Sequence, residues 1–189
     1  WTPAHTAALN TAQVAALTTV QIQALETADL QGLSASAVAA LTATQVSKLL
    51  TAQVAALTTG QVRALEALDV AALSSAQIVA LTTQQAAALS SSQLLALATA
   101  QVRALETADL TVLATEAFNK LSALQVAALS TAQISSLTTA QVDALSTVQL
   151  VALTTAQVRA LATEQVDALR TQQVAALETA DVVQLSAAQ

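Results

Sequence analysis

Apolar and polar positions follow one another along this chain with a fixed period of eight residues. Leucine stands at position 9 and at every eighth position after it, up to position 185. With this leucine at position a, the commonest unit reads L-T-T-A-Q-V-A-A over positions a to h. Position f is apolar from Val14 to Val182, h is nearly always Ala, and e is Gln in 17 octads. Such self-similarity is the signature of a repeat architecture.

A period of eight excludes two common backbones. In a continuous α-helix the leucine row would advance by about 80° per octad and wind around the rod. A β-solenoid would require alternating β-branched residues and corner Gly or Asn, whereas Ala, Leu and Gln favour helix. The pattern therefore predicts a new short helix in every octad.

Positions b and e have the spacing of a helix capping box. Examples are Thr58 with Gln61 and Ser130 with Gln133, where a hydroxyl at the N-cap and a Gln at N3 satisfy each other's backbone amides. Where b is not Ser, Thr or Asn, c is Thr in eight of nine octads, so we expect Thr51 and its equivalents to start those helices. Most acidic residues also lie in the proposed first turns and most basic ones in the last turns, as a helix dipole favours.

These features predict an all-α solenoid of about 23 very short helices, stacked into a superhelical rod. Residues 1–189 form a single array, with Trp1–Ala8 as an irregular first octad. Helices this short need neighbouring coils for support, because nucleation dominates below about 12 residues. Positions e, f and a are expected to face inward, and c and g outward. The pattern fits two octads per coil or three.

Composition narrows the function classes. The chain of 189 residues has a net charge of −6, no Cys and one His. Few basic groups argue against binding nucleic acid, and no apolar run approaches the ~18 residues of a membrane span. No signal peptide is recognisable. His5 has no evident nucleophile or acid beside it, and no phosphate-binding loop occurs, so we expect neither enzyme activity nor a cofactor.

Paired carboxylates are the weak candidates for a metal site. Four octads carry Glu at b together with Asp at e, and a row of such pairs would offer oxygen ligands to Ca²⁺. With two carboxylates per site and no Asp-rich loop, acidic helix N-termini are the favoured interpretation. Arg63 and Arg103 each precede such a Glu by three residues, a spacing that allows an ion pair across the corner, which would add little stability at a surface. The candidates are Glu26, Asp29, Glu66, Asp69, Glu106, Asp109, Glu178 and Asp181.

The octad motif, as in Leu57-Thr58-Thr59-Gly60-Gln61-Val62-Arg63-Ala64, resembles the octapeptide-repeat stretches of very large secreted bacterial proteins. These proteins are described as adhesins, haem-utilisation proteins or RTX-type proteins. The resemblance covers the chain from Leu9 onward and implies an extended spacer at the cell surface or in the extracellular matrix. The G-G-x-G-x-D calcium motif of RTX proteins is absent, so the resemblance implies no calcium-dependent folding.

Two function classes remain. The first is a structural spacer or scaffold whose partners are neighbouring repeats of the same parent chain. The alternative is a repetitive binding surface for a glycan, a protein or ice, formed by the regular Thr rows at c. The octad at 113–120, with Phe118 at f, is expected to be a local repacking of the core. The ends carry no clear capping repeat, so we expect a segment of a longer array or end-to-end self-association.

Overall fold

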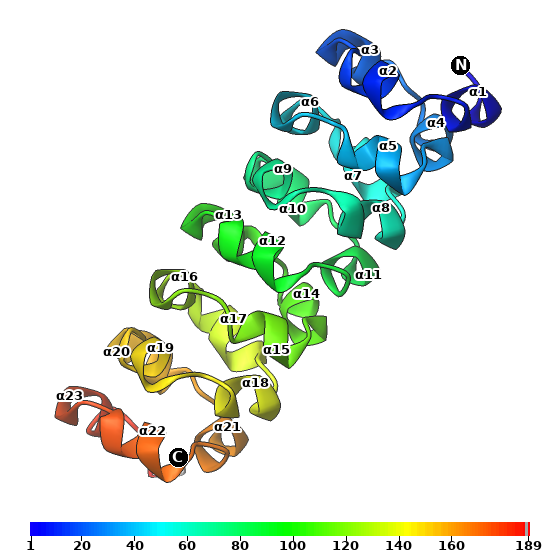
Figure 1. The fold of residues 1–189 in the computed structure, drawn as a ribbon. Helices are drawn as coiled ribbons and strands as arrows, with labels where there is room; N and C mark the ends of the chain where they lie inside the picture. The colour runs from blue at the N-terminus through cyan, green and yellow to red at the C-terminus, as the bar shows by residue number, and fades with distance from the viewer. Residues whose placement is uncertain (188) are drawn as a thin grey trace. The chain divides into compact units, whose positions relative to one another are not determined.

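The computed structural model describes residues 1–187 and 189. Within them it is all-helical, with one short helix in each octad (Figure 1). The helices, of four to six residues each, are α1 Pro3–Ala7, α2 Thr11–Ala15, α3 Thr19–Gln23, α4 Thr27–Gly32, α5 Ala35–Ala39, α6 Ala43–Ser47, α7 Thr51–Ala56, α8 Thr59–Ala64, α9 Ala67–Ala71, α10 Ser75–Val79, α11 Thr83–Ala86, α12 Ser91–Ala96, α13 Thr99–Ala104, α14 Thr107–Val112, α15 Thr115–Phe118, α16 Ala123–Ala127, α17 Thr131–Ser136, α18 Thr139–Asp143, α19 Thr147–Val151, α20 Thr155–Arg159, α21 Thr163–Asp167, α22 Thr171–Ala176 and α23 Thr179–Val182.

Each helix has its N-cap at b, and its last residue lies one to three positions before the next leucine. The b residue has extended backbone angles, as at Thr58 with φ −70° and ψ 157°. At the other end the leucine N–H donates to the carbonyl of the f residue three positions earlier, as Leu17 does to Val14 at 3.1 Å. This tighter final bond closes the helix and turns the chain into the next corner. The prediction of one helix per octad is confirmed.

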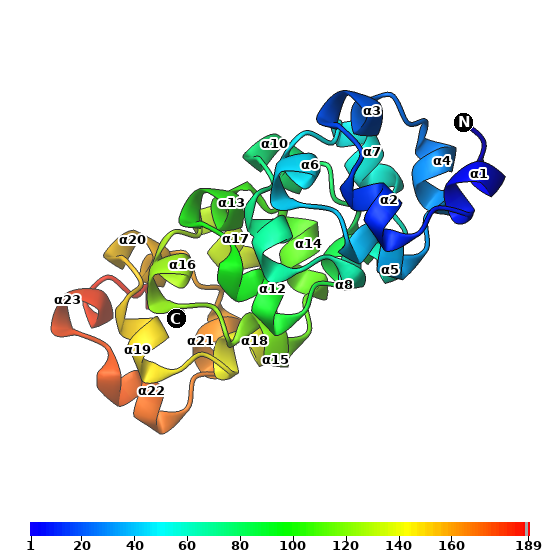
Figure 2. The ribbon, with the colours of Figure 1, turned by 45° about the horizontal axis from the view of Figure 1, so that its top comes forward.

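Helices stack on partners three octads away. In residues 1–97 each helix from α1 to α9 packs on the third helix after it, for example α4 on α7, α5 on α8 and α6 on α9. In residues 98–189 the same rule places α14 against α17 and α16 against α19. A coil therefore contains three octads, which resolves the alternative between two and three. Figure 2 shows the successive coils from a second direction.

The chain divides into two compact units, Trp1–Leu97 with α1 to α12 and Ala98–Gln189 with α13 to α23. Each unit is built in the same way, from three-helix coils stacked one on the next. The octad sequence itself runs from one unit into the other without an insertion.

Leucines at a and apolar residues at f form the core of each unit. Side chains such as Leu30, Ile78 and Leu150 are completely buried, and Leu or Val at these positions recurs in coil after coil. Phe118, the largest f residue, is also buried, which agrees with the expected local repacking. Position e is buried as well, while c, d and g are mostly exposed. The predicted inward and outward positions are therefore confirmed.

One expectation about the helix starts is wrong. Helix α7 begins after Leu50 and α13 after Ala98, so Thr51 and Thr99 are the first helical residues and not their caps. Neither N-cap offers a side-chain acceptor. The start does not shift by one residue because the coil holds position e, and therefore the whole octad, in a constant register. The Thr side chains at c are left at the surface.

Candidate functional site

The Gln side chain at e closes the start of its own helix, as the capping-box spacing predicts. In α8 the Thr58 N–H donates to Gln61 Oε1 at 2.8 Å, and Thr58 Oγ1 accepts from the Gln61 N–H at 3.2 Å. In α7 only the Gln arm is present, and the Leu50 N–H donates to Gln53 Oε1 at 2.9 Å. The hydrogen bond from the b N–H to the Gln side chain is therefore formed even where the residue at b has no side-chain acceptor.

The other end of the same side chain bonds the preceding coil. Gln53 Nε2 donates to the carbonyls of Ile22 at 2.9 Å and Leu25 at 2.7 Å, on α3 and the corner that follows it. Equivalent bonds to the leucine carbonyl 28 residues earlier recur in both units, and we call this set the glutamine ladder. Its members are Gln45, Gln53, Gln61, Gln77, Gln85, Gln93, Gln133, Gln141, Gln149, Gln157, Gln165, Gln173 and Gln189.

The ladder supplies hydrogen-bond donors to backbone carbonyls that very short helices leave without a partner. The last four carbonyls of a helix have no partner inside it, and burying them without one is costly. The amide of a buried ladder Gln, such as Gln85 at 2% exposure, supplies that partner from the next coil. Within each unit, most octads after the first coil are thus bonded to the coil before them.

Sequence reasoning missed this second bond because it connects residues 28 apart. One signal could have revealed it. A capping box accepts either Gln or Glu at N3, yet e is never Glu in this acidic chain. A carboxylate would serve the cap equally well and could not donate to a carbonyl, so the exclusion of Glu indicates that the amide N–H is required.

Four octads have Asp at e in place of Gln. Asp69 Oδ2 accepts from the Glu66 N–H at 3.1 Å, and Asp29 Oδ2 accepts from the Glu26 N–H at 3.3 Å. Both Asp side chains are buried like the Gln they replace. An ionised Asp keeps the capping arm of the box and lacks the donor for the preceding coil.

Burial of Asp69 makes its ionised form less favourable. Desolvation raises the pKa of this carboxyl above its usual value. The Glu66 N–H opposes the rise because it bonds the ionised form, and the Glu66 carboxylate adds to it by repulsion. Asp69 is thus a weak point in the stacking of its unit, where a charge replaces a bond.

The structure does not bring the paired carboxylates into one row. Glu26 and Asp29 belong to α4, which packs on α1 and α7, whereas Glu66 and Asp69 belong to α9, which packs on α6 and α12. Among the described residues no three His, Cys, Asp or Glu side chains are grouped to hold a metal ion. The two remaining pairs belong to the second unit, Glu106 with Asp109 to α14 and Glu178 with Asp181 to α23. These two helices are in the same stack, where α17 and α20 lie between them.

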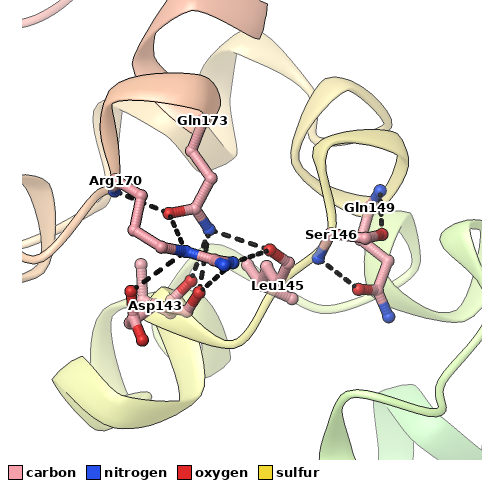
Figure 3. Close-up of polar contacts among 7 residues, drawn as sticks. Asp143, Leu145, Ser146, Gln149, Arg170 and Gln173 are labelled. Carbon is pink, nitrogen blue, oxygen red and sulfur yellow. Dashed lines mark hydrogen bonds and ion pairs between the residues drawn. The ribbon is translucent and has the colours of Figure 1, made fainter.

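One exposed ion pair supplements the ladder (Figure 3). Arg170, at the start of α22, places Nε 3.2 Å from Asp143 Oδ1. Its guanidinium also donates to the carbonyls of Asp143 at 2.6 Å and Leu145 at 3.2 Å, which Gln173 Nε2 bonds as well. The arginine therefore reinforces a ladder position through backbone carbonyls.

The two ion pairs that the spacing allows are not formed in the described part of the chain. The charged side-chain atoms of Arg63 and Glu66 are more than 4 Å apart, and so are those of Arg103 and Glu106. Among the described residues, the ion pair that does form joins Arg170 and Asp143. The extended backbone at each corner, as at Leu65 with ψ 137°, separates the end of one helix from the start of the next.

The remaining surface features carry no evident chemistry. His5 is exposed on α1 and lines a shallow depression with Trp1, Ala4 and Ala8. A groove of about 590 Å³ in the second unit is lined by Arg103 and by the hydroxyl-bearing side chains of Thr99 and Thr131, among others. None of the described helices is both long enough and apolar enough to cross a bilayer.

The family comparison agrees with the octad pattern. A family model described as the ALTTAQ repeat matches residues 22–59, 62–99, 102–139, 125–155 and 142–179. Four of the matches begin at 22, 62, 102 and 142, which are five octads apart. Since five is not a multiple of three, equivalent octads of successive matches fall on different sides of a coil. A comparison with curated proteins gave no match. The chain belongs to the ALTTAQ repeat family.

Proposed function

We propose that this chain is a non-catalytic structural segment that acts as an extended spacer or scaffold in a large bacterial surface or extracellular protein. Tandem membership of a repeat family supports a structural role. The resemblance of the octads to repeat stretches of large secreted bacterial proteins supports the location and the parent type. The uniform repetition of one packing unit, with polar groups used for stacking, supports the absence of catalysis.

A single observation carries the spacer proposal. Within each unit a helix packs on helices of the coil before and the coil after, and the glutamine ladder recurs along these junctions, except where e is Asp or Ala. Stability and length in such arrays are approximately sums over neighbouring repeats. Adding octads then extends the protein without requiring a new core.

Small-angle X-ray scattering on arrays of different length tests this proposal. Removing residues 50–73, or duplicating them, changes the chain by one coil and keeps the octad phase. We expect the maximum dimension to change by a constant step per coil at an unchanged cross-section. A radius of gyration that follows the compact-domain scaling of about N^0.38 would reject the spacer.

The proposed location has its own test. Antibodies raised against the chain should label intact cells or the matrix of the producing bacterium without permeabilisation. Labelling that requires permeabilised cells would contradict a surface or extracellular role, and it would leave the stacked fold unaffected.

A second candidate function is a repetitive binding surface. The Thr side chains at c lie one residue inside each helix and do not cap it, so their hydroxyls face solvent in rows. In the second unit Thr107, Thr131 and Thr155 begin α14, α17 and α20, which stack on one another. Thermal hysteresis or glycan retention that is lost on replacing these three Thr with Val would support it. Inactivity in both assays would exclude the ice and glycan versions.

A further inference from the structure

The second unit carries a cluster of exposed apolar side chains on the side of one helix stack. In this stack α13, α16, α19 and α22 pack on one another in order. Leu124 on α16 is 76% exposed, and Val148 and Val151 on α19 are 69% and 42% exposed. We call these three side chains the apolar patch. Because α16 and α19 each have a stacked helix on both sides, the patch faces sideways, and further coils stacked along the array would not cover it.

The patch departs from the repeat at a position that folding does not use. Leu124 and Val148 occupy d, which is mostly exposed in this fold. In every third octad before them the residue at d is alanine, namely Ala4, Ala28, Ala52, Ala76 and Ala100. Alanine is the better helix former, and an aliphatic side chain gains its burial free energy, about 1.5–3 kcal/mol, only when it is covered. Exposed apolar patches of this kind mark interaction sites.

A mostly apolar pocket of about 310 Å³ lies one coil further along the same stack. It is formed between α19 and α22 by Thr147, Val148, Val151 and Ala176. Ala176 is partly buried, as are Ala128 and Ala152 at the same place in the two coils before it, so this wall of the pocket has the packing of an inner coil. The stack therefore presents a protruding leucine, Leu124, and a pocket for an aliphatic side chain on one face.

Charge makes this face suitable for contact with a second copy of the chain. Positions c, d and g of α16, α19 and α22 hold no charged residue. The same positions of α15, α18 and α21 hold four carboxylates, which are Glu116, Asp143, Glu164 and Asp167. Arg170, at the start of α22, is already paired with Asp143. Two copies with a net charge of −6 each can thus meet through the apolar patch without bringing carboxylates together.

We propose that the apolar patch is a self-association surface, on which Leu124 of one copy inserts into the pocket beside Val148 of a second copy. Leucine and pocket are offset along the same stack, so a two-fold axis across the stack, with the two copies antiparallel, fills both pockets at once. A parallel pair in register would place Leu124 against Leu124 and leave both pockets empty. The antiparallel contact is isologous, and assembly through it stops at the dimer. Three aliphatic side chains per copy make a small contact beside the roughly 1,200 Å² of a stable interface, so we expect a Kd of about 100 μM or weaker.

Sedimentation velocity up to millimolar concentration tests this inference, which rests on the surface of the second unit and not on the spacer function. The chain of 19.1 kDa should show a monomer–dimer equilibrium. Leu124→Glu with Val148→Glu should lower the association constant about tenfold or more, because it places charges in the contact. Glu116 and Glu164 already occupy position d, so circular dichroism of this variant should stay unchanged.

Val20→Glu with Leu68→Glu is the matched control. Both residues occupy d and are 73% exposed, on α3 and α9 of the first unit. The control adds the same two charges to the chain away from the apolar patch, and it should leave association unchanged.

Disulfide cross-linking tests the antiparallel arrangement, because the chain has no Cys of its own. Ala123→Cys places a thiol beside Leu124, and Thr147→Cys places one at the pocket. A mixture of the two single variants should form the mixed dimer in excess of both homodimers. This measurement also keeps the test decisive if the double Glu variant loses helicity.

A constant mass of 19.1 kDa at every concentration would overturn the proposal. A series that extends beyond the dimer, or association that the two pairs of Glu variants weaken equally, would also overturn it. Homodimers in excess of the mixed disulfide would overturn it as well. Each of these results leaves the spacer proposal to be decided by the scattering experiment.

Discussion

The side-chain amide of Gln53 donates to the carbonyl of Leu25 at 2.7 Å, across 28 residues of sequence. The oxygen of the same amide accepts from the Leu50 N–H at 2.9 Å. One glutamine therefore starts its own helix and completes the C-terminal end of a helix in the coil before it. The small core of this chain is stable in part because one residue type performs both tasks at most coil junctions.

Gln53→Glu should separate these two tasks. The new carboxylate keeps the capping acceptor, loses the donor and faces the carbonyls of Ile22 and Leu25. We expect urea unfolding to show a loss of about 2 kcal/mol, because buried acceptors are left without a partner. Gln13→Glu is the control, since the exposed Gln13 side chain bonds the start of its own helix and no carbonyl of another coil in the described chain, and it should change stability by less than about 0.5 kcal/mol. Equal losses in the two variants would show that capping alone matters.

The position of the N-cap predicts which hydroxyls stabilise the helices. Ser74 caps α10 by accepting from the Gln77 N–H at 3.2 Å, so Ser74→Ala should cost about 1 kcal/mol in urea unfolding. Thr51 lies inside α7 and does not cap it, so Thr51→Ala should be almost neutral. A larger loss for Thr51 than for Ser74 would contradict the assignment of b as the cap.

The two glycines should respond to alanine in opposite directions. A Cβ on Gly32 would lie 2.6 Å from the Pro3 carbonyl oxygen and from Thr6 Oγ1, so Gly32→Ala should destabilise the packing of α1 on α4 by about 1–3 kcal/mol. A Cβ on Gly60 meets only Thr58 Oγ1 at 3.9 Å. Gly60→Ala should therefore stabilise α8 by about 0.5 kcal/mol, as helix propensity predicts. Thermal or urea unfolding of both variants checks the pair.

Asp69 should make the stability of its unit depend on pH. Burial raises its pKa, so its contribution to stability is complete below the unfolded value of about 3.9 and is lost as the pH rises through the folded value. Asp69→Asn should thus be more stable than the native chain at pH 7, with a difference that shrinks toward pH 4. Asp69→Gln should add about 1 kcal/mol more by restoring a ladder donor.

Unfolding in urea at a series of pH values between 4 and 7 measures this difference. Asp167→Asn alters an exposed carboxylate and should show no such trend. A difference between Asp69→Asn and the native chain that is constant with pH would mean that burial of the charge does not determine the effect.

Local features of the chain were predictable from the residues alone. The octad period, the N-cap at b where b is Ser, Thr or Asn, the capping arm of Gln61 and the burial of Phe118 all depend on contacts within a few positions or on side-chain size. The helix starts in octads without a hydroxyl or Asn at b were not predictable in this way. Thr51 was expected to replace a missing cap, yet the helix start stayed at Leu50, because the register is held by contacts with other coils.

The sequence by itself determined that every eight residues form one short helix with an apolar a and f face, since capping, propensity and periodicity act along the chain. Only the tertiary structure decided that three octads make a coil and that Gln53 bonds Leu25. It also decided that the missing side chain of Gly32 leaves room for α1, and that Asp29 and Asp69 lie in different stacks of helices. These relationships join residues 24 or more positions apart. They depend on how carbonyls and side chains of separate helices meet in space, which an eight-residue pattern does not specify.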